Sequence, residues 1–500
     1  MARTIASRMR YAVKGMEPNM TICSEPRRRN NCPIAPGSER ASAIARGARY
    51  AKALTLAAMS LGYVVVQLDV TIVNVAINSI GADFGGSVAD LQWIVNAYTI
   101  TFAAFILTAG ALGDRLGARR IFIAGFAVFV LASLACALAP GLPVLIVARL
   151  CQGVGAAILV PNSLALLNHA YPEEHERHWA VGIWAAGASF SLTAGPLVGG
   201  ALIALFGWRS IFLINLPIGF AGIWLTWRYA AESARAAARA FDIPGQITAV
   251  LALGSLAAAM IEGGERGCSD GFVLIGFAAF AILAALFLAT DFRSKTPMLP
   301  LGLFRKPAFS AMALTGLLVN IGCYGLIFVF SLYFQRLDHL SPLWTGLAFA
   351  PMMAAVLATN LIAASVTAAI GARLTIASGL AIMAASCLAL LGLRQGVPYA
   401  ALCAQLIGLG GGLGLLVPPM TSTLLGSVTK HHSGIASGVL NAMRQTGSVI
   451  GVALFGALLG GAGGFIAGVR IALAIAAALA LCALVATVIG VPRPTRTSAP

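Results

Sequence analysis

The chain has 500 residues, of which 59% are hydrophobic and only 10% are charged. Soluble domains carry about 25% charged residues, so this composition excludes a water-soluble globular protein and makes lipid the solvent of most of the surface. The formal net charge of +16 does not indicate a nucleic-acid partner, because no basic domain with aromatic readers accompanies it.

Fourteen apolar stretches follow one another along the chain, each long enough to cross a bilayer as a helix. In lipid every backbone polar group needs an internal partner, and the long Ala/Leu/Ile/Gly runs lack the alternation of a membrane β-barrel. We therefore predict an all-α polytopic membrane protein. The predicted spans are 54–78, 91–111, 121–139, 143–168, 179–204, 210–228, 244–262, 271–290, 308–333, 344–369, 373–393, 398–425, 433–460 and 465–490.

The distribution of Lys and Arg predicts the orientation. Segment 1–53 holds eleven of them against three acids, and the loops on that side, with the tail 491–500, hold fifteen more. Because basic segments stay in the cytoplasm, both termini are predicted to be cytoplasmic. Segment 1–53 lacks the apolar core of a signal peptide. It is either a disordered basic tail or sequence upstream of the true start codon.

Two segments recur at nearly one spacing, which predicts an internal repeat. Gly117–Arg119 matches Gly371–Arg373 at an offset of 254, and the segment from Gly195 resembles the one from Gly447 at an offset of 252. Parallel repeats of this kind form one transporter architecture, with the substrate site near the midplane between the halves. The predicted parts are two six-helix bundles, 54–228 and 308–490, and an inserted helix pair, 244–290.

Asp69 is the carboxylate that lies well inside a predicted span, about 15 residues or roughly 22 Å from its cytoplasmic end. An acid at this depth costs about 2.5–3.5 kcal/mol to insert, so it should face a cavity or a partner. Burial favours the neutral form of a carboxyl group. We therefore favour a proton-coupling site or a counter-charge for a cationic substrate over a purely structural pair.

Arg149 lies six residues into the fourth span, at a depth similar to that of Asp69, and Gln152 follows one turn later. It either pairs with Asp69 or holds the bundle together by hydrogen bonds to backbone carbonyls, and the sequence does not decide between them. In the thirteenth span Asn441, Arg444 and Gln445 face either a water-filled cavity or neighbouring helices; we favour interhelix hydrogen bonds.

Two glycine-containing motifs could serve as gates. The turn after the second span contains Gly113, Asp114, Arg115, Gly117, Arg119 and Arg120. It predicts either an ion-pair latch or, on its own, a simple basic anchor. The fifth span contains Gly195, Pro196, Gly199 and Gly200. Proline bends a helix and glycines let another helix approach, so this motif predicts close packing or a gating bend.

The sequence shows no motif of an enzyme. There is no ATPase signature, nucleophile elbow or HExxH, and the glycine-rich run 408–414 lacks the Lys-Ser/Thr of a phosphate loop. His431 and His432 could bind a metal, but a solvated loop is the better interpretation. We predict no catalytic residue, no metal and no cofactor, so energy would come from a gradient or a partner subunit.

Six motifs occur in order on the predicted helices. They are Leu68–Ala76, Gly110–Arg120, Arg149–Gly155, Gly195–Gly200, Trp208–Gly219, and Gly434–Gly438 with Asn441, Arg444 and Gln445. With these motifs the chain, from about 54 to 490, resembles the major facilitator superfamily, specifically its fourteen-span drug:proton antiporter branch of multidrug efflux proteins.

The resemblance implies a proton-driven exporter of small, mostly apolar drugs or metabolites, working by alternating access. Asp69 and Arg149 would couple protons. The gates would be formed by Gly113, Asp114, Arg115, Gly117, Arg119, Arg120, Gly195, Pro196, Gly199 and Gly200. The substrate cavity would contain Thr71, Asn74, Gln152, Asn441, Arg444 and Gln445.

The chain departs from the family pattern in places. Ser191 stands where the fifth-helix motif has Gly, Ala368 replaces the acid of Asp114 in the second half, and span ten has no acid. This favours neutral or singly charged compounds over dications. The alternatives are an importer of another small solute, against which the proline-glycine motif argues, and a non-transporting receptor or scaffold.

The expected partners are a small-molecule substrate, protons and the lipid bilayer. One chain carries both predicted repeats and could therefore act as a monomer. The excess of Arg over Lys suggests a bacterial source. The predicted location is then the plasma (inner) membrane, which the chain would cross many times.

Overall fold

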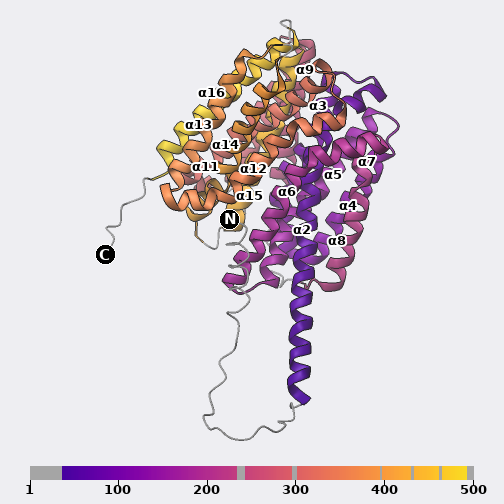
Figure 1. Cartoon of the computed structure of the whole chain (residues 1–500), viewed down its shortest axis with the longest axis vertical. Coiled ribbons are helices and arrows are strands. Elements are labelled where there is room, and N and C mark those ends of the chain that lie inside the picture. Colours follow the sequence, from indigo (N-terminus) through magenta and orange to yellow (C-terminus); the bar gives the residue numbers. More distant parts are fainter. Residues whose placement is uncertain are drawn as a thin grey trace. The chain divides into compact units, whose positions relative to one another are not determined.

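The computed structural model describes residues 36–232, 242–267, 269–294, 301–394, 397–429, 433–460 and 464–492. All regular structure in these ranges is helical (Figure 1). The chain divides into two compact units, Met1–Arg49 and Tyr50–Pro500. His431 and His432 lie outside the described residues, as do most of the two predicted tails.

The helices follow one another with short connections. In the first part of the chain they are α2 Pro36–Phe84, α3 Val88–Leu116, α4 Ala118–Ala137, α5 Leu142–Ala170, α6 Glu174–Phe206, α7 Ser210–Leu213 and α8 Asn215–Tyr229. Then come α9 Ile243–Arg266, α10 Gly271–Arg293 and the short η1 Leu301–Arg305. The last part contains α11 Pro307–Leu332, η2 Tyr333–Leu337, α12 Pro342–Ile370, α13 Ala372–Ala389, η3 Leu390–Gly392, α14 Tyr399–Gly426, α15 Ser433–Leu459 and α16 Phe465–Gly490.

Thirteen of the described helices are long and apolar enough to cross a membrane. Helix α6 has 33 residues, and its last part, Thr193–Phe206, is also apolar. The chain is therefore a multi-pass membrane protein. The count of fourteen spans and the twofold repeat stay predictions.

Two boundaries differ from the predicted ones. Helix α2 begins at Pro36, so 36–53, which the sequence places in a disordered tail, is helical; its Ala and Arg residues are good helix formers. The predicted span 210–228 is broken into α7 and α8 after Leu213. Pro217 has no N–H to donate to the carbonyl of Leu213, so the helix is interrupted there.

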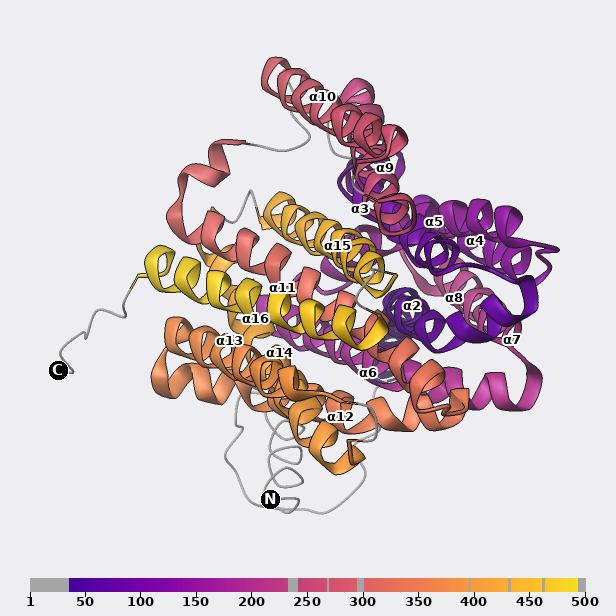
Figure 2. The ribbon, with the colours of Figure 1, turned by 90° about the horizontal axis from the view of Figure 1, so that it is seen from above.

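The helices of unit Tyr50–Pro500 pack in recognisable groups. Helices α3, α4 and α5 contact one another, and α8 packs on α4. Later in the chain α11 packs on α15 and α16, and α14 packs on α12 and α13. The two groups meet where α6 contacts α12 and α3 contacts α15. Helix α9 lies against α3 and α15, and α10 lies outside it with its apolar face almost wholly exposed (Figure 2).

Candidate functional site

Asp69 and Arg149 form a fully buried ion pair. Asp69 in α2 is 0% exposed and Arg149 in α5 is 1% exposed, and Nη1 of the arginine lies 2.5 Å from Oδ2 of the aspartate. Arg149 also donates from Nε to the carbonyl oxygen of Ile94 at 3.1 Å. Arg149 therefore both pairs with Asp69 and donates a hydrogen bond to a backbone carbonyl, the two roles that the sequence left open.

Two amides complete the coordination of the Asp69 carboxylate. Gln152 donates from Nε2 to Oδ1 at 2.8 Å, and Asn215 of α8 donates from Nδ2 to the same oxygen at 3.1 Å. Ser133 of α4 accepts from both amides, at 2.9 and 3.3 Å. The carboxylate thus ties α2 to α5 and α8 and, through Ser133, to α4.

Aromatic rings close the other side of the pair. The guanidinium carbon of Arg149 lies 4.4 Å from the ring centre of Tyr98 and 5.9 Å from that of Phe212. Such cation–π contacts stabilise a desolvated guanidinium. The pair is shielded from water in this conformation, so a proton can reach Asp69 only if the helices around it move.

The structure adds site residues that the sequence missed. Asn215 lies within the recognised motif Trp208–Gly219, and an amide in an apolar span was its available signal. Ser133 and Tyr98 carried no signal, because a serine in a membrane helix usually hydrogen-bonds to its own backbone and a tyrosine there most often simply packs against its neighbours. Their role depends on which helices become neighbours, which one sequence does not reveal.

The predicted gate after α3 is attached to the end of α8 by Glu232. The backbone N–H of Arg119 donates to Oε1 of Glu232 at 3.0 Å, and Nε of Arg120 lies 3.7 Å from Oε2. Gly117 has a φ of 102°, and a side chain there would lie 2.6 Å from the same carboxylate. Asp114 and Arg115 make further interactions. The sequence did not identify Glu232, whose partners are more than a hundred residues away.

Gly113, at the other end of this gate, serves helix packing. A methyl group there would collide with the side-chain oxygen of Asn162 in α5. Asn162 in turn donates from Nδ2 to the carbonyl oxygen of Ala109 at 3.1 Å. The glycine therefore lets α3 and α5 lie in direct contact.

The glycines of α6 let this helix touch two neighbours. A methyl group at Gly195 would collide with Oγ1 of Thr71, and one at Gly199 would lie 2.6 Å from Ile72 in α2. On the other face a methyl at Gly200 would lie 2.6 Å from the carbonyl oxygen of Pro342 in α12. Close packing, the plainer of the two interpretations, is what this motif provides here.

Pro196 takes part in the same contact. A methyl group at Gly346 of α12 would collide with the carbonyl oxygen of Pro196. Helix α6 is therefore held between α2 and α12, so a movement of α2 can reach α12 through it.

Further hydrogen bonds join the two groups near their predicted outer ends. Gln335 donates from Nε2 to the carbonyl oxygen of Val75 at 3.1 Å. Gln92 at the start of α3 donates to the carbonyl oxygens of Val452 and Ala453 in α15, both at 2.8 Å. Towards the predicted cytoplasmic ends, α6 and α12 carry exposed side chains such as Phe190 and Leu361. The hydrogen bonds between the two helix groups thus include contacts near the end of α2 and the start of α3.

The residues predicted to line the substrate cavity lie in three kinds of surroundings. Gln152 belongs to the Asp69 network. Thr71 and Asn74 are buried and donate to carbonyls of their own helix. Asn441, Arg444 and Gln445 are partly exposed on α15.

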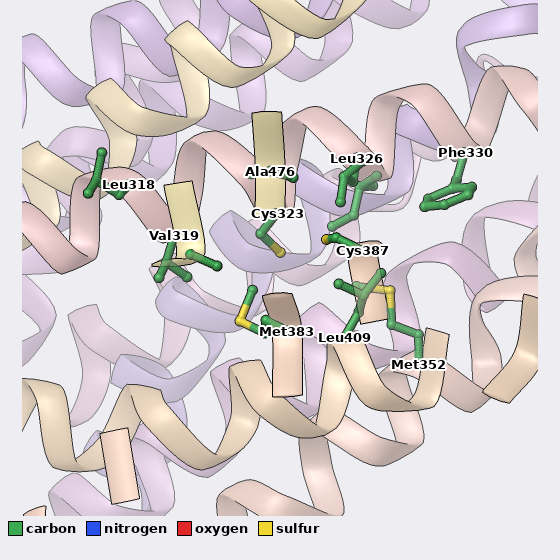
Figure 3. A pocket seen from close by; sticks show the side chains of 13 residues that line it. Leu318, Val319, Cys323, Leu326, Phe330, Met352, Met383, Cys387, Leu409 and Ala476 are labelled. Carbon is green, nitrogen blue, oxygen red and sulfur yellow. The ribbon is translucent and has the colours of Figure 1, made fainter. Parts of the chain in front are cut away.

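A separate small cavity of about 20 Å³ lies among helices α11 to α14 and α16 (Figure 3). Its apolar lining includes Cys323, Met352, Met383 and Cys387. This space holds about one water molecule, too little for a drug-sized compound, and none of the predicted cavity residues lines it.

Comparisons with known proteins agree on the protein family of this chain. A family model described as Major Facilitator Superfamily matches residues 59–452. The Methylenomycin A resistance protein of Streptomyces coelicolor is 36% identical over 424 residues, covering 85% of this chain and 89% of that protein. The Multidrug resistance protein Stp of Mycobacterium tuberculosis is 38% identical over 411 residues, covering 81% and 75%. The human organic anion transporter MFSD10 has the same fold, with a TM-score of 0.61 at 14% identity over 87% of this chain and 99% of that one.

Proposed function

The chain belongs to the Major Facilitator Superfamily, and from that premise we propose that it exports small, mostly apolar drugs or metabolites in exchange for protons. Relatives named as resistance and multidrug efflux proteins support export. The observation that carries proton coupling is the buried Asp69–Arg149 pair, the titratable centre of the first helix group.

We further propose that the chain is of the fourteen-span drug:proton antiporter branch. In this proposal α9 and α10 are a helix pair inserted between two parallel repeats, 54–228 and 308–490. Both termini lie in the cytoplasm, and the protein crosses the inner membrane of a bacterium. Helix α9 lies beside α3 and α15, and α10 lies on α9, away from the contact of α6 with α12, which supports an insertion.

Protonation of Asp69 would change the forces between helices. The carboxylate accepts hydrogen bonds from Arg149, Gln152 and Asn215. A neutral acid accepts weaker bonds, and Arg149 would then be a buried charge without a counter-charge, which is costly in a low-dielectric interior. The protonated state therefore favours separation of α2 from α5 and α8, and the deprotonated state favours their contact.

The packing offers a route from the proton site to the contact between the helix groups. Thr71 lies two residues after Asp69 and packs against Gly195, so a displacement of α2 pushes on α6. The carbonyl of Pro196, the next residue, lies against Gly346 of α12. A two-state packing of these glycine contacts would convert the charge change into rocking of one helix group on the other.

The test is transport in everted membrane vesicles under an imposed pH gradient. The probes are ethidium, N-phenyl-1-naphthylamine and 8-anilino-1-naphthalenesulfonate, which are cationic, neutral and anionic dyes. Asp69→Asn is compared with Asp83→Asn, since Asp83 is on the same helix but pairs with Arg209 in partly exposed surroundings. We expect gradient-driven uptake of at least one dye, lost in Asp69→Asn and kept in Asp83→Asn. Equal transport by both variants would remove Asp69 as the coupling site.

A further inference from the structure

Arg444 holds a positive charge near the middle of α15 without a protein partner. It lies eleven residues after Ser433, or about 16 Å along the helix. Its Cγ packs 3.4 Å from where a side chain on Gly316 of α11 would begin. Its Nε is buried and makes no hydrogen bond. In the described part of the chain no acid forms an ion pair with it.

Other unpartnered polar atoms lie on the same face of α15. Asn441, Arg444, Gln445 and Ser448 follow one another at spacings of three, one and three residues, which places them on one side of a helix. Oε1 of Gln445 and Oγ of Ser448 are buried without a hydrogen-bond partner, like Nε of Arg444. Buried polar atoms are nearly always paired, so this stripe is able to form hydrogen bonds with a molecule that enters between the helices.

The charges of the interior define the sign of that partner. Asp69 is already paired with Arg149, and together they form a neutral ion pair that is shielded from water. Arg444 is then the uncompensated charge at mid-membrane depth in the described helices. A guanidinium in such a medium repels a cation and gains most from a carboxylate, sulfonate or phosphate, which it can bind through two N–H groups.

An aromatic stack lies on the other helix group. Tyr63 of α2 stacks on Trp184 of α6, with ring centres 4.1 Å apart and planes at 17°. Trp184 is fixed by a hydrogen bond from Nε1 to Ser163 at 3.1 Å. The first helix group therefore carries a rigid, flat apolar surface, and the second carries the cation.

We propose that Arg444 is the anchor for an acidic group of the exported compound, and that the preferred substrates are monoanionic molecules with a flat apolar body. The hydroxyl of Ser448 supplies a further hydrogen bond to the same group, and the Tyr63–Trp184 stack contacts the apolar body. This inference rests on the proposed export function, whose substrate class it specifies.

The experiment uses two dyes that share one aromatic body. N-phenyl-1-naphthylamine is neutral, and 8-anilino-1-naphthalenesulfonate is the same skeleton with one anionic group. Binding is measured on the purified full chain in nanodiscs by energy transfer from tryptophan to the dye, and transport is measured in everted vesicles. The variants are Arg444→Gln, Arg444→Lys and the control Arg470→Gln. Arg470 is a helix arginine of the same group whose Nε and Nη2 donate to the carbonyl oxygen of Leu393.

We expect the native chain to bind the anionic dye more tightly than the neutral one. Loss of a charge-assisted contact lowers binding affinity by a factor of about 10 to 100. Arg444→Gln should therefore lower the affinity for the anionic dye by that factor and change the affinity for the neutral dye by no more than about twofold. Arg444→Lys should recover part of the loss, and Arg470→Gln should keep the native preference. If Arg444 had only a structural role, its replacement would lower the affinity for both dyes equally.

The outcomes separate the two proposals. Anion-selective binding that depends on Arg444, without gradient-driven transport, would refute export and leave the anion site standing. Gradient-driven transport of the anionic dye that is unaffected by Arg444→Gln would support export and overturn the anion site. Equal affinity of the native chain for the two anilinonaphthalene dyes would also overturn it.

Discussion

Removal of Arg149 alone should destabilise the protein far more than removal of both charges of the buried pair. Arg149→Gln leaves the Asp69 carboxylate buried without its counter-charge, and breaking such a pair costs about 3–5 kcal/mol. The double variant Asp69→Asn with Arg149→Gln buries two neutral amides instead. It loses hydrogen bonds worth about 1 kcal/mol each but no unpaired charge, so it should be more stable than Arg149→Gln.

A double-mutant cycle measures this difference. The free energy of unfolding is followed by circular dichroism in mixed micelles with increasing dodecyl sulfate, for the native chain, both single variants and the double variant. The matched control is the same cycle at Asp83 and Arg209, which lie 2.9 Å apart but are 45% and 43% exposed. We expect a coupling energy above about 2 kcal/mol for the buried pair and below about 1 kcal/mol for the exposed one. Similar coupling in both cycles would refute the claim that burial gives the Asp69 pair its strength.

Three further perturbations test other contacts of the structure. Gly195→Ala introduces a methyl group that collides with α2 and should reduce export at least tenfold without loss of protein, whereas Gly182→Ala in the same helix meets nothing within 4 Å and should transport normally. Glu232→Gln weakens the hydrogen-bond acceptor of the Arg119 backbone N–H, so hydrogen exchange at that amide should become faster. An unchanged rate would mean that Glu232 does not stabilise the turn after α3. Burial and, second, the charge of Glu176 raise the pKa of Tyr171, so its contribution to stability is full below the ordinary value of about 10 and is lost as pH rises through the folded-state pKa. Tyr171→Phe should flatten that alkaline loss in unfolding midpoints, and an unaltered profile would contradict the assignment.

The features that could be predicted from the sequence are those that depend on one helix at a time. Apolar length identified the membrane helices, and the cost of inserting a charge marked Asp69 and Arg149 before their contact was known. The break between α7 and α8 was missed, although Pro217 carries its cause, because a single proline often only kinks a span.

Features that depend on neighbours could not be predicted. Ser133 and Asn215 matter because α4 and α8 meet α2 at the level of Asp69, and Glu232 matters because the end of α8 reaches the turn after α3. A single sequence contains no information on which helices are adjacent. The sequence marked Arg444 by its charge inside a span, but the absence of an acidic partner among the described residues depends on its neighbours.

Arg149 and Arg444 together constrain how protons and substrate could be coupled. Protonation of Asp69 leaves the charge of Arg149 uncompensated, which adds positive potential to the interior and should attract an anion at Arg444 more strongly. Two unit charges interact by about 4 kcal/mol at a separation of about 4 Å and an effective dielectric of about 20, and the energy falls in inverse proportion to the separation.

Exchange requires that proton binding weaken anion binding, but the charge effect of protonation strengthens it. The coupling must therefore run through the packing of Thr71 on Gly195 and of Pro196 on Gly346. It follows that Asp69→Asn, which mimics the protonated acid, should bind 8-anilino-1-naphthalenesulfonate several-fold more tightly in nanodiscs while losing gradient-driven export. Weaker binding by this variant would mean that proton and anion compete directly, and that the helix contacts are not the coupling element.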